Sequence, residues 1–168
     1  MIHIPTLMIT ALGPTHGRKD FKCGAEILDR YLEKQAGQDV KRRISRVYVA
    51  TDLQHPQVII GFYTLSTLSI DLKQLPDQLA QKLPRHPVPA ALIGRLAVNK
   101  TAQGQGVGTM LLADAIKRTL AVSDQIAIYA IVVDAMNDNA SKFYEQFGFT
   151  RLSDDPQRLF LPLKSIHF

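Results

Sequence analysis

The chain has 168 residues, of which 46% are hydrophobic and 21% charged, so it can form one domain with a sizeable core and is not disordered. Its formal charge of +5 favours an anionic partner but does not identify one. A single cysteine, Cys23, excludes an internal disulfide, and no signal-peptide pattern, membrane-spanning apolar run or metal-ligand motif is evident. We therefore expect a single domain over residues 1–168, in the cytoplasm, with no metal and no membrane contact.

The N-terminal part of the chain predicts a strand, a helix and a β-hairpin. The strand is expected at Leu7–Leu12, and the apolar periodicity of residues 23–39 indicates a helix that Gly37 would end. Two β-branched and aromatic runs within Val47–Ile70 are separated by Asp-Leu-Gln-His-Pro, which is typical of a hairpin. The proline-rich residues 75–89 would form an excursion with one helical turn.

The central part predicts two parallel strands joined by a helix. Residues 90–98 and Ile126–Val133 are near-continuous apolar runs, as expected for strands that are covered on both faces. Between them, residues 108–123 place apolar side chains at helical spacing. A strand, a helix and a strand in this order are typical of a parallel pair with a helical crossover.

The C-terminal part predicts a short helix and a last strand. Residues 137–149 begin with Asn and Asp, which cap helices, and Gly148 would close the helix. Residues 158–166 have the composition of a strand, and Pro162 indicates a position at the edge of the sheet. Together the elements predict an α/β (α+β) fold with a mixed sheet flanked by helices.

A glycine-rich segment joins the strand at 90–98 to the helix at 108–123. Its glycines, Gly104, Gly106 and Gly108, come directly before the helix, where backbone N–H groups lack partners and the helix dipole is positive. Such a loop can bind phosphate, because glycines let the backbone approach a ligand closely. The alternative is a flexible surface loop, and the flanking strand and helix favour the phosphate.

Two common phosphate-binding motifs do not fit this loop. A P-loop requires Gly-Lys-Ser or Gly-Lys-Thr at the helix start, where the chain has Gly108, Thr109 and Met110. A dinucleotide fingerprint requires a final Gly or Ala where the chain has Thr109 or Leu111. Asp134, which follows the next strand, could imitate the acid that binds a ribose, so the dinucleotide alternative stays open.

Two motifs resemble the GNAT acetyltransferase superfamily. Gln103, Gly106 and Gly108 match its Gln/Arg-x-x-Gly-x-Gly/Ala loop, and residues 137–149 match its closing segment, Asn-x-x-Ala-x-x-Phe-Tyr-Glu-x-x-Gly-Phe. The resemblance is close over Ala91–Phe149. It implies the GNAT fold, in which two parallel strands of a mixed sheet splay apart and acetyl-CoA lies in the gap.

The resemblance places acetyl-CoA against backbone groups of the strand before the loop and against the loop itself. Asn137 would contact the pantetheine arm, or else it is only a helix cap. The implied acetyl-CoA contacts are Leu96, Ala97, Val98, Gln103, Gly104, Gln105, Gly106, Val107, Gly108, Thr109, Asn137 and Phe143.

Tyr144 matches the tyrosine that serves as general acid in many members of the superfamily. A phenol has an ordinary pKa of about 10 and can protonate the leaving CoA thiolate at neutral pH. The alternative is a core aromatic residue. Many members also have a glutamate on the strand before the loop, where this chain has Arg95 and no carboxylate. The missing carboxylate favours an α-amino substrate, whose pKa is about 7–8, over a lysine side chain.

A narrower resemblance covers most of the chain. A Phe-x-Cys-Gly opening, a Leu-Asp-x-Tyr-Leu helix and a Pro-Val-Pro approach to Gly-Arg-Leu-Ala-Val are similar to the GNAT toxins of bacterial toxin–antitoxin pairs. This resemblance implies acetylation of the α-amino group of aminoacyl-tRNA, which blocks translation. It also implies a ribbon-helix-helix antitoxin, operator DNA bound only through that antitoxin, and a homodimer. Neither the tRNA that is chosen nor the general base is indicated by the sequence.

Basic residues are expected to hold tRNA phosphates near the site. For Lys41–Arg46 the alternative is a solvated helix end, and for Arg95 it is a buried structural pair. Two other functions stay open, an ordinary GNAT enzyme for a small amine or a protein N-terminus, and a non-catalytic acyl-CoA-binding regulator. The expected tRNA contacts are Lys41, Arg42, Arg43, Arg46, Lys82, Arg85 and Arg95.

Overall fold

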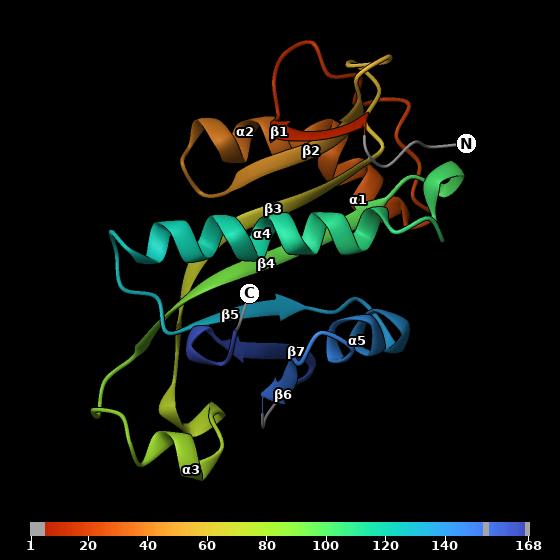
Figure 1. The fold of residues 1–168 in the computed structure, drawn as a ribbon. Helices are drawn as coiled ribbons and strands as arrows, with labels where there is room; N and C mark the ends of the chain where they lie inside the picture. The colour runs from red at the N-terminus through yellow and green to blue at the C-terminus, as the bar shows by residue number, and fades with distance from the viewer. Residues whose placement is uncertain (1–5, 153–154, 167–168) are drawn as a thin grey trace. The chain divides into compact units, whose positions relative to one another are not determined.

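Two compact units make up the chain in the computed structural model, which describes residues 6–152 and 155–166 (Figure 1). The first unit holds Met1–Ser66 and Arg95–Lys117, and the second holds Thr67–Gly94 and Arg118–Phe168. The boundary between the units falls within three elements, which are β3 (Gly61–Ile70), β4 (Val88–Val98) and α4 (Val107–Ser123).

Antiparallel strands form the sheet of the first unit. β1 (Leu7–Ala11) pairs with β2 (Arg46–Asp52), and β2 pairs with β3. The register places Ile9 opposite Ala50 and Val49 opposite Phe62. The predicted strand at Leu7–Leu12 and the predicted hairpin within Val47–Ile70 are therefore confirmed.

The helix of the first unit consists of α1 (Glu26–Arg30), a π-helical turn (Tyr31–Gln35) and α2 (Ala36–Lys41). The prediction that Gly37 ends this helix is wrong, because the helix continues beyond it. A tertiary contact accounts for the glycine instead. A Cβ atom at Gly37 would lie only 2.7 Å from Nη1 of Arg18, so a larger residue would displace the guanidinium.

This helix and the strands share one hydrophobic core. The rings of Phe21 and Phe62 meet edge to face with centroids 5.5 Å apart, and Tyr31 stacks on Phe62 at 6.3 Å. Each such buried side chain stabilises the fold by about 1.5–3 kcal/mol. Ala97 of β4 belongs to the same cluster. The core thus supports the end of β4, where the glycine loop begins.

The parallel pair lies in the second unit. β4 pairs with β5 (Ala130–Asp134) from Ala90↔Ala130 to Ile93↔Val133, and β4 continues beyond these pairs to its end. α4 connects the two strands, which confirms the predicted crossover. β5 begins later than predicted, because the N–H of Ile126 bonds to the carbonyl of Val122 at 3.0 Å in the turn that ends α4.

β7 (Asp155–Pro162) lies between β5 and β6 (Thr150–Leu152) and is antiparallel to both. The sequence did not predict the short β6. The inference from Pro162 that the last strand is an edge strand is therefore wrong. The pairs with β6 reach only Phe160, so Pro162, opposite Ala130, has no β6 neighbour to which it would have to donate an N–H.

Among the described residues the strand order is β1-β2-β3-β4-β5-β7-β6, and the sheet is mixed because β4 and β5 are parallel whereas β1–β2, β2–β3, β5–β7 and β6–β7 are antiparallel. This confirms the predicted mixed sheet with flanking helices. The proline-rich excursion contains one short helix, α3 (Asp77–Ala80), after a 3₁₀ turn (Leu72–Gln74). Within the described ranges, no helix is both long enough and apolar enough to cross a membrane.

Candidate functional site

The glycine loop of the first unit has the backbone that its glycines predict. Gly104 and Gly106 have φ angles of +78° and +87°, a left-handed region that other residues rarely adopt. The N–H of Met110 bonds to the carbonyl of Gly106 at 3.1 Å, as the first α-helical bond across the start of α4. Because the first amides of a helix have no helical acceptor, Val107 and Thr109 lie in an electropositive turn that suits an anion.

Gln103 fixes this loop through its side chain. Its Nε2 donates to the carbonyl oxygens of Cys23 at 2.8 Å and of Val98 at 2.9 Å. Because Nε2 already donates to two protein carbonyls, only the backbone or Oε1 of Gln103 is left to contact acetyl-CoA. The bonds tie the loop to the end of β4 and to the segment before α1.

Most loop residues that are predicted to bind acetyl-CoA face solvent. Gln103, Gly104, Gly106 and Thr109 are exposed, whereas the side chain of Val107 is buried. Leu96, Val98, Gln105 and Gly108 are half-buried, and Ala97 is buried. For Val107 and Ala97, only backbone groups remain for a ligand.

Sequence reasoning missed Gly61, which lies against the strand end that leads into the loop and against the start of α4. A Cβ atom at Gly61 would lie 2.9 Å from the carbonyl oxygen of Ala97 and 2.9 Å from Cδ1 of Leu111. The absence of a side chain therefore lets β3 approach both the end of β4 and the first turns of α4. An isolated glycine in a strand was the available signal, since it often marks a close backbone approach.

Tyr144 lies in the second unit, near the end of α5 (Asp138–Glu145), and is 4% exposed. Its ring contacts Phe143 and Phe149 edge to face, with centroids 5.2 Å and 5.7 Å away. The hydroxyl makes no hydrogen bond within the described residues, and those residues hold no fully buried polar side-chain atom without a partner. The hydroxyl oxygen of Tyr144 is therefore not fully buried, although the residue as a whole is.

The surroundings of Tyr144 keep its phenol protonated. Burial is the main cause that raises the pKa of Tyr144 far above its ordinary value, and the negative charge of Asp134 raises it further. The phenol therefore carries its proton at neutral pH, which is the protonation state that a general acid requires before the reaction. The ring of Tyr144 is part of the core, as one alternative predicted. The predicted function as general acid concerns only its hydroxyl, so the two interpretations are compatible.

Asn137 caps α5, as one of the two alternatives predicted. Its Oδ1 accepts a hydrogen bond from the N–H of Ala140 at 2.9 Å. α5 ends at Glu145, and Gly148, the glycine predicted to close it, ends the turn that follows, with a φ angle of +94°. There the N–H of Phe149 bonds to the carbonyl of Tyr144 at 3.4 Å. Both ends of the helix that holds Tyr144 are therefore fixed by local bonds.

Asp134 is engaged in an ion pair with Arg158. Nε and Nη2 of Arg158 lie 2.7 Å and 3.2 Å from the two carboxylate oxygens. This bidentate contact occupies the acid that the dinucleotide alternative requires for a ribose.

Among the described residues, no group of three or more His, Cys, Asp or Glu side chains is placed to hold a metal ion.

Arg95, on β4 in the first unit, stacks on an aromatic ring. Its guanidinium carbon lies 3.6 Å from the ring centre of Tyr31. The hydroxyl of Tyr31 donates to Oδ2 of the buried Asp39 at 2.8 Å. Arg95 therefore has the structural partner that one alternative predicted, and its contact with tRNA stays a prediction.

The basic run is exposed around the end of α2 and the start of β2. Lys41, Arg42, Arg43 and Arg46 all face solvent, which suits both a phosphate contact and a solvated helix end. Arg43 has a φ angle of +59° and its N–H bonds to the carbonyl of Val40 at 3.1 Å. It thus occupies the left-handed position after a helix that glycine normally takes. Lys82 and Arg85 are also exposed and belong to the second unit.

Comparison with known proteins supports the motif analysis. A family model described as an acetyltransferase (GNAT) domain matches residues 43–151. A tRNA-acetylating toxin of Mycobacterium tuberculosis (strain ATCC 25618 / H37Rv) is 37% identical over 144 residues, which cover 86% of this chain and 84% of the relative. A probable toxin TacT of Sinorhizobium fredii (strain NBRC 101917 / NGR234) is 32% identical over 168 residues, with 95% and 92% covered.

Solved structures agree with the sequence relatives. A tyrosine-to-phenylalanine mutant of KacT has a TM-score of 0.90 and 31% identity, covering 95% of this chain and 96% of that chain. AtaT complexed with acetyl-methionyl-tRNAfMet has a TM-score of 0.88 and 29% identity, with the same coverage of 95% and 96%. A tyrosine-to-phenylalanine mutant of AtaT, bound to the C-terminus of the antitoxin AtaR and to acetyl-CoA, has a TM-score of 0.81 and 26% identity, with 95% of both chains covered.

The family model covers more than half of the chain, and both relatives align over most of their own length. The fold and the two sequence motifs point to the same group of proteins. The chain belongs to the GNAT acetyltransferase family and, within it, groups with the GNAT toxins.

Proposed function

We propose that this protein is a toxin that transfers the acetyl group of acetyl-CoA to the α-amino group of an aminoacyl-tRNA. The proposal is carried by the occurrence of the loop motif at Gln103–Thr109 and the tyrosine motif at Asn137–Phe149 in a chain 37% identical to a tRNA-acetylating toxin. AtaT complexed with acetyl-methionyl-tRNAfMet supports the same class of substrate. An acetylated α-amine cannot form a peptide bond, so translation would stop in the cytoplasm, where aminoacyl-tRNA is used.

Acetyl-CoA would be held mainly by backbone groups. The amides of Gly104–Thr109 would bind the pyrophosphate, since they lie at an exposed, electropositive helix start. The backbone of Leu96–Val98 would pair with the pantetheine arm as an added strand does. Phe143 and Asn137, next to Tyr144 in the sequence, would contact the arm from α5. The acetyl-CoA in the AtaT mutant complex supports this assignment.

The chemical step needs a neutral amine, a stabilised oxyanion and an acid for the leaving group. The amine nitrogen attacks the thioester carbon, and the carbonyl oxygen becomes negatively charged. When the carbon–sulfur bond breaks, the CoA thiolate takes the phenolic proton of Tyr144. The amine loses one proton as the amide forms, and that proton passes through solvent to restore Tyr144. The products are an N-acetyl-aminoacyl-tRNA and CoA.

The absence of a carboxylate from β4 (Val88–Val98) fits an α-amine. β4 contains Arg95 where many GNAT enzymes have glutamate, and the ring of Tyr31 covers one face of its guanidinium. An α-amine with a pKa of about 7–8 is partly neutral at pH 7 and needs little help to lose its proton. A lysine side chain, with a pKa of about 10.4, would need a base.

Protein and nucleic-acid partners follow from the same proposal. The exposed cations at Lys41–Arg46, with Arg85 and Arg95, would contact tRNA phosphates. A ribbon-helix-helix antitoxin would neutralise the toxin and would alone bind operator DNA. AtaT bound to the C-terminus of AtaR supports an antitoxin partner. We also propose a homodimer, which size-exclusion chromatography with light scattering would test.

The deciding experiment follows labelled acetyl groups. The protein is incubated with labelled acetyl-CoA and charged tRNA, and the RNA is then digested to nucleosides. Label on aminoacyl adenosine supports the proposal. Label found only on added polyamines or peptides would identify an ordinary GNAT enzyme, and no transfer together with acetyl-CoA binding would identify a non-catalytic regulator.

A further inference from the structure

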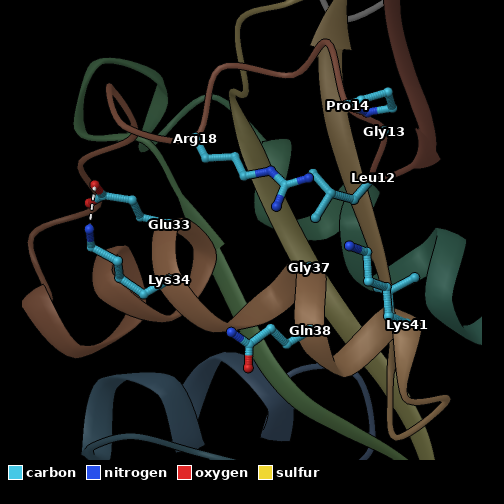
Figure 2. Close-up of a pocket in the computed structure, with 10 residues that line it drawn as sticks. Leu12, Gly13, Pro14, Arg18, Glu33, Lys34, Gly37, Gln38 and Lys41 are labelled. Atoms are coloured by element: carbon cyan, nitrogen blue, oxygen red, sulfur yellow. Dashed lines mark ion pairs between the residues drawn. The ribbon is translucent and has the colours of Figure 1, made fainter.

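A hollow of 470 Å³ opens on the first unit, between the loop after β1 and the helix formed by the π-helical turn and α2 (Figure 2). Leu12 and Arg18 line it from the loop side, and Gly37 and Lys41 line it from the helix side. Figure 2 shows the side chain of Arg18 crossing above Gly37 and that of Lys41 rising from α2 towards Leu12. Arg18, Lys41 and a third cationic residue, Lys34, therefore line one concave surface. We call this surface, defined by Arg18, Gly37 and Lys41, the Arg18 hollow.

Arg18 is seated on Gly37. Nη1 of Arg18 lies 2.7 Å from the position that a Cβ atom of Gly37 would occupy, so the guanidinium rests against the helix backbone. The residue is half-buried. A glycine within a helix costs about 0.5–1 kcal/mol relative to alanine. The chain thus has a destabilising residue at the place that accommodates the guanidinium.

Neither Arg18 nor Lys41 has an acidic partner. Among residues 6–152 and 155–166, the side chains of Arg18 and Lys41 make no hydrogen bond and no ion pair. Glu33 also lines the hollow, but its carboxylate pairs with Lys34 at 3.6 Å. A half-buried, unpaired guanidinium has lost part of its hydration without compensation, so an anion from outside would stabilise it.

The surroundings favour a phosphodiester over a protein carboxylate. Lys41 is also the first residue of an exposed basic run that continues through Arg42 and Arg43 to Arg46. A row of cations matches the regularly spaced charges of a nucleic-acid backbone, and a planar guanidinium fits two oxygens of one phosphate. We propose that Arg18, held in place by Gly37, and Lys41 bind one backbone phosphate of an RNA chain. The proposal rests on the proposed function in taking the RNA to be the tRNA substrate.

The test compares variants that remove the charge with one that only moves it. Arg18→Gln and Lys41→Gln each remove a cation. Gly37→Ala keeps both cations but places a methyl group where the guanidinium lies, and the long arginine side chain can move aside without unfolding the protein. Arg30→Gln is the control, because Arg30 is exposed on the preceding helix and pairs with Glu26 at 3.0 Å.

The measurement is the dissociation constant of deacylated bulk bacterial tRNA over a series of KCl concentrations. Each contact with a phosphate contributes about 0.7–0.9 to the slope of log K against log salt. Because Arg18 and Lys41 share one phosphate, we expect Arg18→Gln, Lys41→Gln and Gly37→Ala each to lower the slope by part of one such contact and to weaken binding several-fold, with Arg30→Gln unchanged. For acetylation of aminoacyl-tRNA, KM should rise while kcat stays. Gly37→Ala should also raise the unfolding temperature, because alanine is favoured over glycine within a helix. A more stable protein that binds tRNA more weakly would show that Arg18 acts in binding, because a purely structural Arg18 would not produce both results.

Other outcomes would overturn either this inference or the proposed function, and the measurements distinguish the two. If the wild type acetylates aminoacyl-tRNA but all three variants keep the full salt slope, the Arg18 hollow does not bind RNA. If the variants keep that slope but lose affinity for an oligoglutamate peptide, the hollow takes a protein carboxylate, and the inference fails. If the slopes fall but the wild type acetylates no aminoacyl-tRNA, the phosphate site stands and the proposed function fails.

Discussion

The guanidinium of Arg95 lies 3.6 Å from the ring centre of Tyr31, whose hydroxyl donates a 2.8 Å hydrogen bond to Asp39. The three side chains connect β4 with the π-helical turn, which holds Tyr31, and with α2, which holds Asp39. Burial, followed by the hydrogen bond to Asp39, raises the pKa of Tyr31 to about 12. The phenol therefore remains protonated and keeps its donor function over the physiological pH range.

Tyr31→Phe should destabilise the protein without removing the support of Arg95. The substitution keeps the ring beneath the guanidinium but leaves Asp39, which is 7% exposed, without its phenolic donor. Loss of a partner for a buried acceptor costs about 1–3 kcal/mol. Urea unfolding of the variant and of Tyr129→Phe, which changes a half-buried tyrosine of the second unit, would measure the difference. Equal unfolding free energies would show that the bond to Asp39 contributes nothing.

Tyr144→Phe should abolish most of the acetyl transfer and leave the fold intact. The hydroxyl makes no bond within the described residues, so its removal costs little stability, whereas loss of a general acid lowers kcat by about 100- to 10,000-fold. Steady-state kinetics with acetyl-CoA and aminoacyl-tRNA, and growth after induction, would check both effects. An active or still toxic Tyr144→Phe protein would remove Tyr144 from the acid function.

Gly61→Ala should disturb the glycine loop from a distance in the sequence. The new Cβ would lie 2.9 Å from the carbonyl oxygen of Ala97 and from Cδ1 of Leu111, so backbone must move. We expect a loss of about 1–3 kcal/mol in stability and a higher KM for acetyl-CoA. Gly13→Ala is the matched control, because its nearest contact would be an ordinary 3.8 Å to His16. A normal KM for Gly61→Ala would separate this glycine from the loop.

Arg43→Gly should separate stability from tRNA binding. Arg43 has a φ angle of +59°, which costs a non-glycine residue about 1 kcal/mol, so glycine should raise the unfolding free energy by that order. Loss of the charge should weaken tRNA binding and lower its salt slope by about 0.7–0.9. Arg42→Gly, at a φ angle of −81°, should bring no gain in stability. If Arg43→Gly is more stable but binds tRNA with unchanged affinity, the basic run is only a solvated helix end and Arg43 does not contact tRNA.

Acid should destabilise the loop that carries Arg18. Burial and the nearby charge of Arg18 lower the pKa of His16, whose neutral Nδ1 accepts the N–H of Gly13 at 2.9 Å. Because the folded-state pKa lies below the unfolded one, this contribution is complete above about pH 6.5 and is lost as the pH falls through the folded value. Urea unfolding at pH 5 and pH 7.5 should show the loss for the wild type and a smaller one for His16→Gln. Equal pH dependence in both proteins would contradict the assignment.

Features encoded over short stretches were predictable from the sequence. The alternation of glycines before an amphipathic run predicted the loop, and the left-handed φ angles of Gly104 and Gly106 explain why glycine occurs there. The helix cap at Asn137 and the turn that ends at Gly148 also depend on hydrogen bonds between residues close in the sequence. The parallel pair followed from two apolar runs separated by a helix.

Other features depended on contacts between residues far apart in the chain. The sequence predicted that Gly37 ends a helix, whereas in the structure the guanidinium of Arg18 lies where a side chain would be. Gly61 could be explained only by the close approach of Ala97 and Leu111. Pro162 misled because β6, a short strand, pairs with only part of β7. The sequence by itself determined the family, the loop and the tyrosine motif, because these are local patterns. Only the tertiary structure decided what Arg18, Gly61 and Arg95 contact, because packing brings together side chains whose separation along the chain carries no signal.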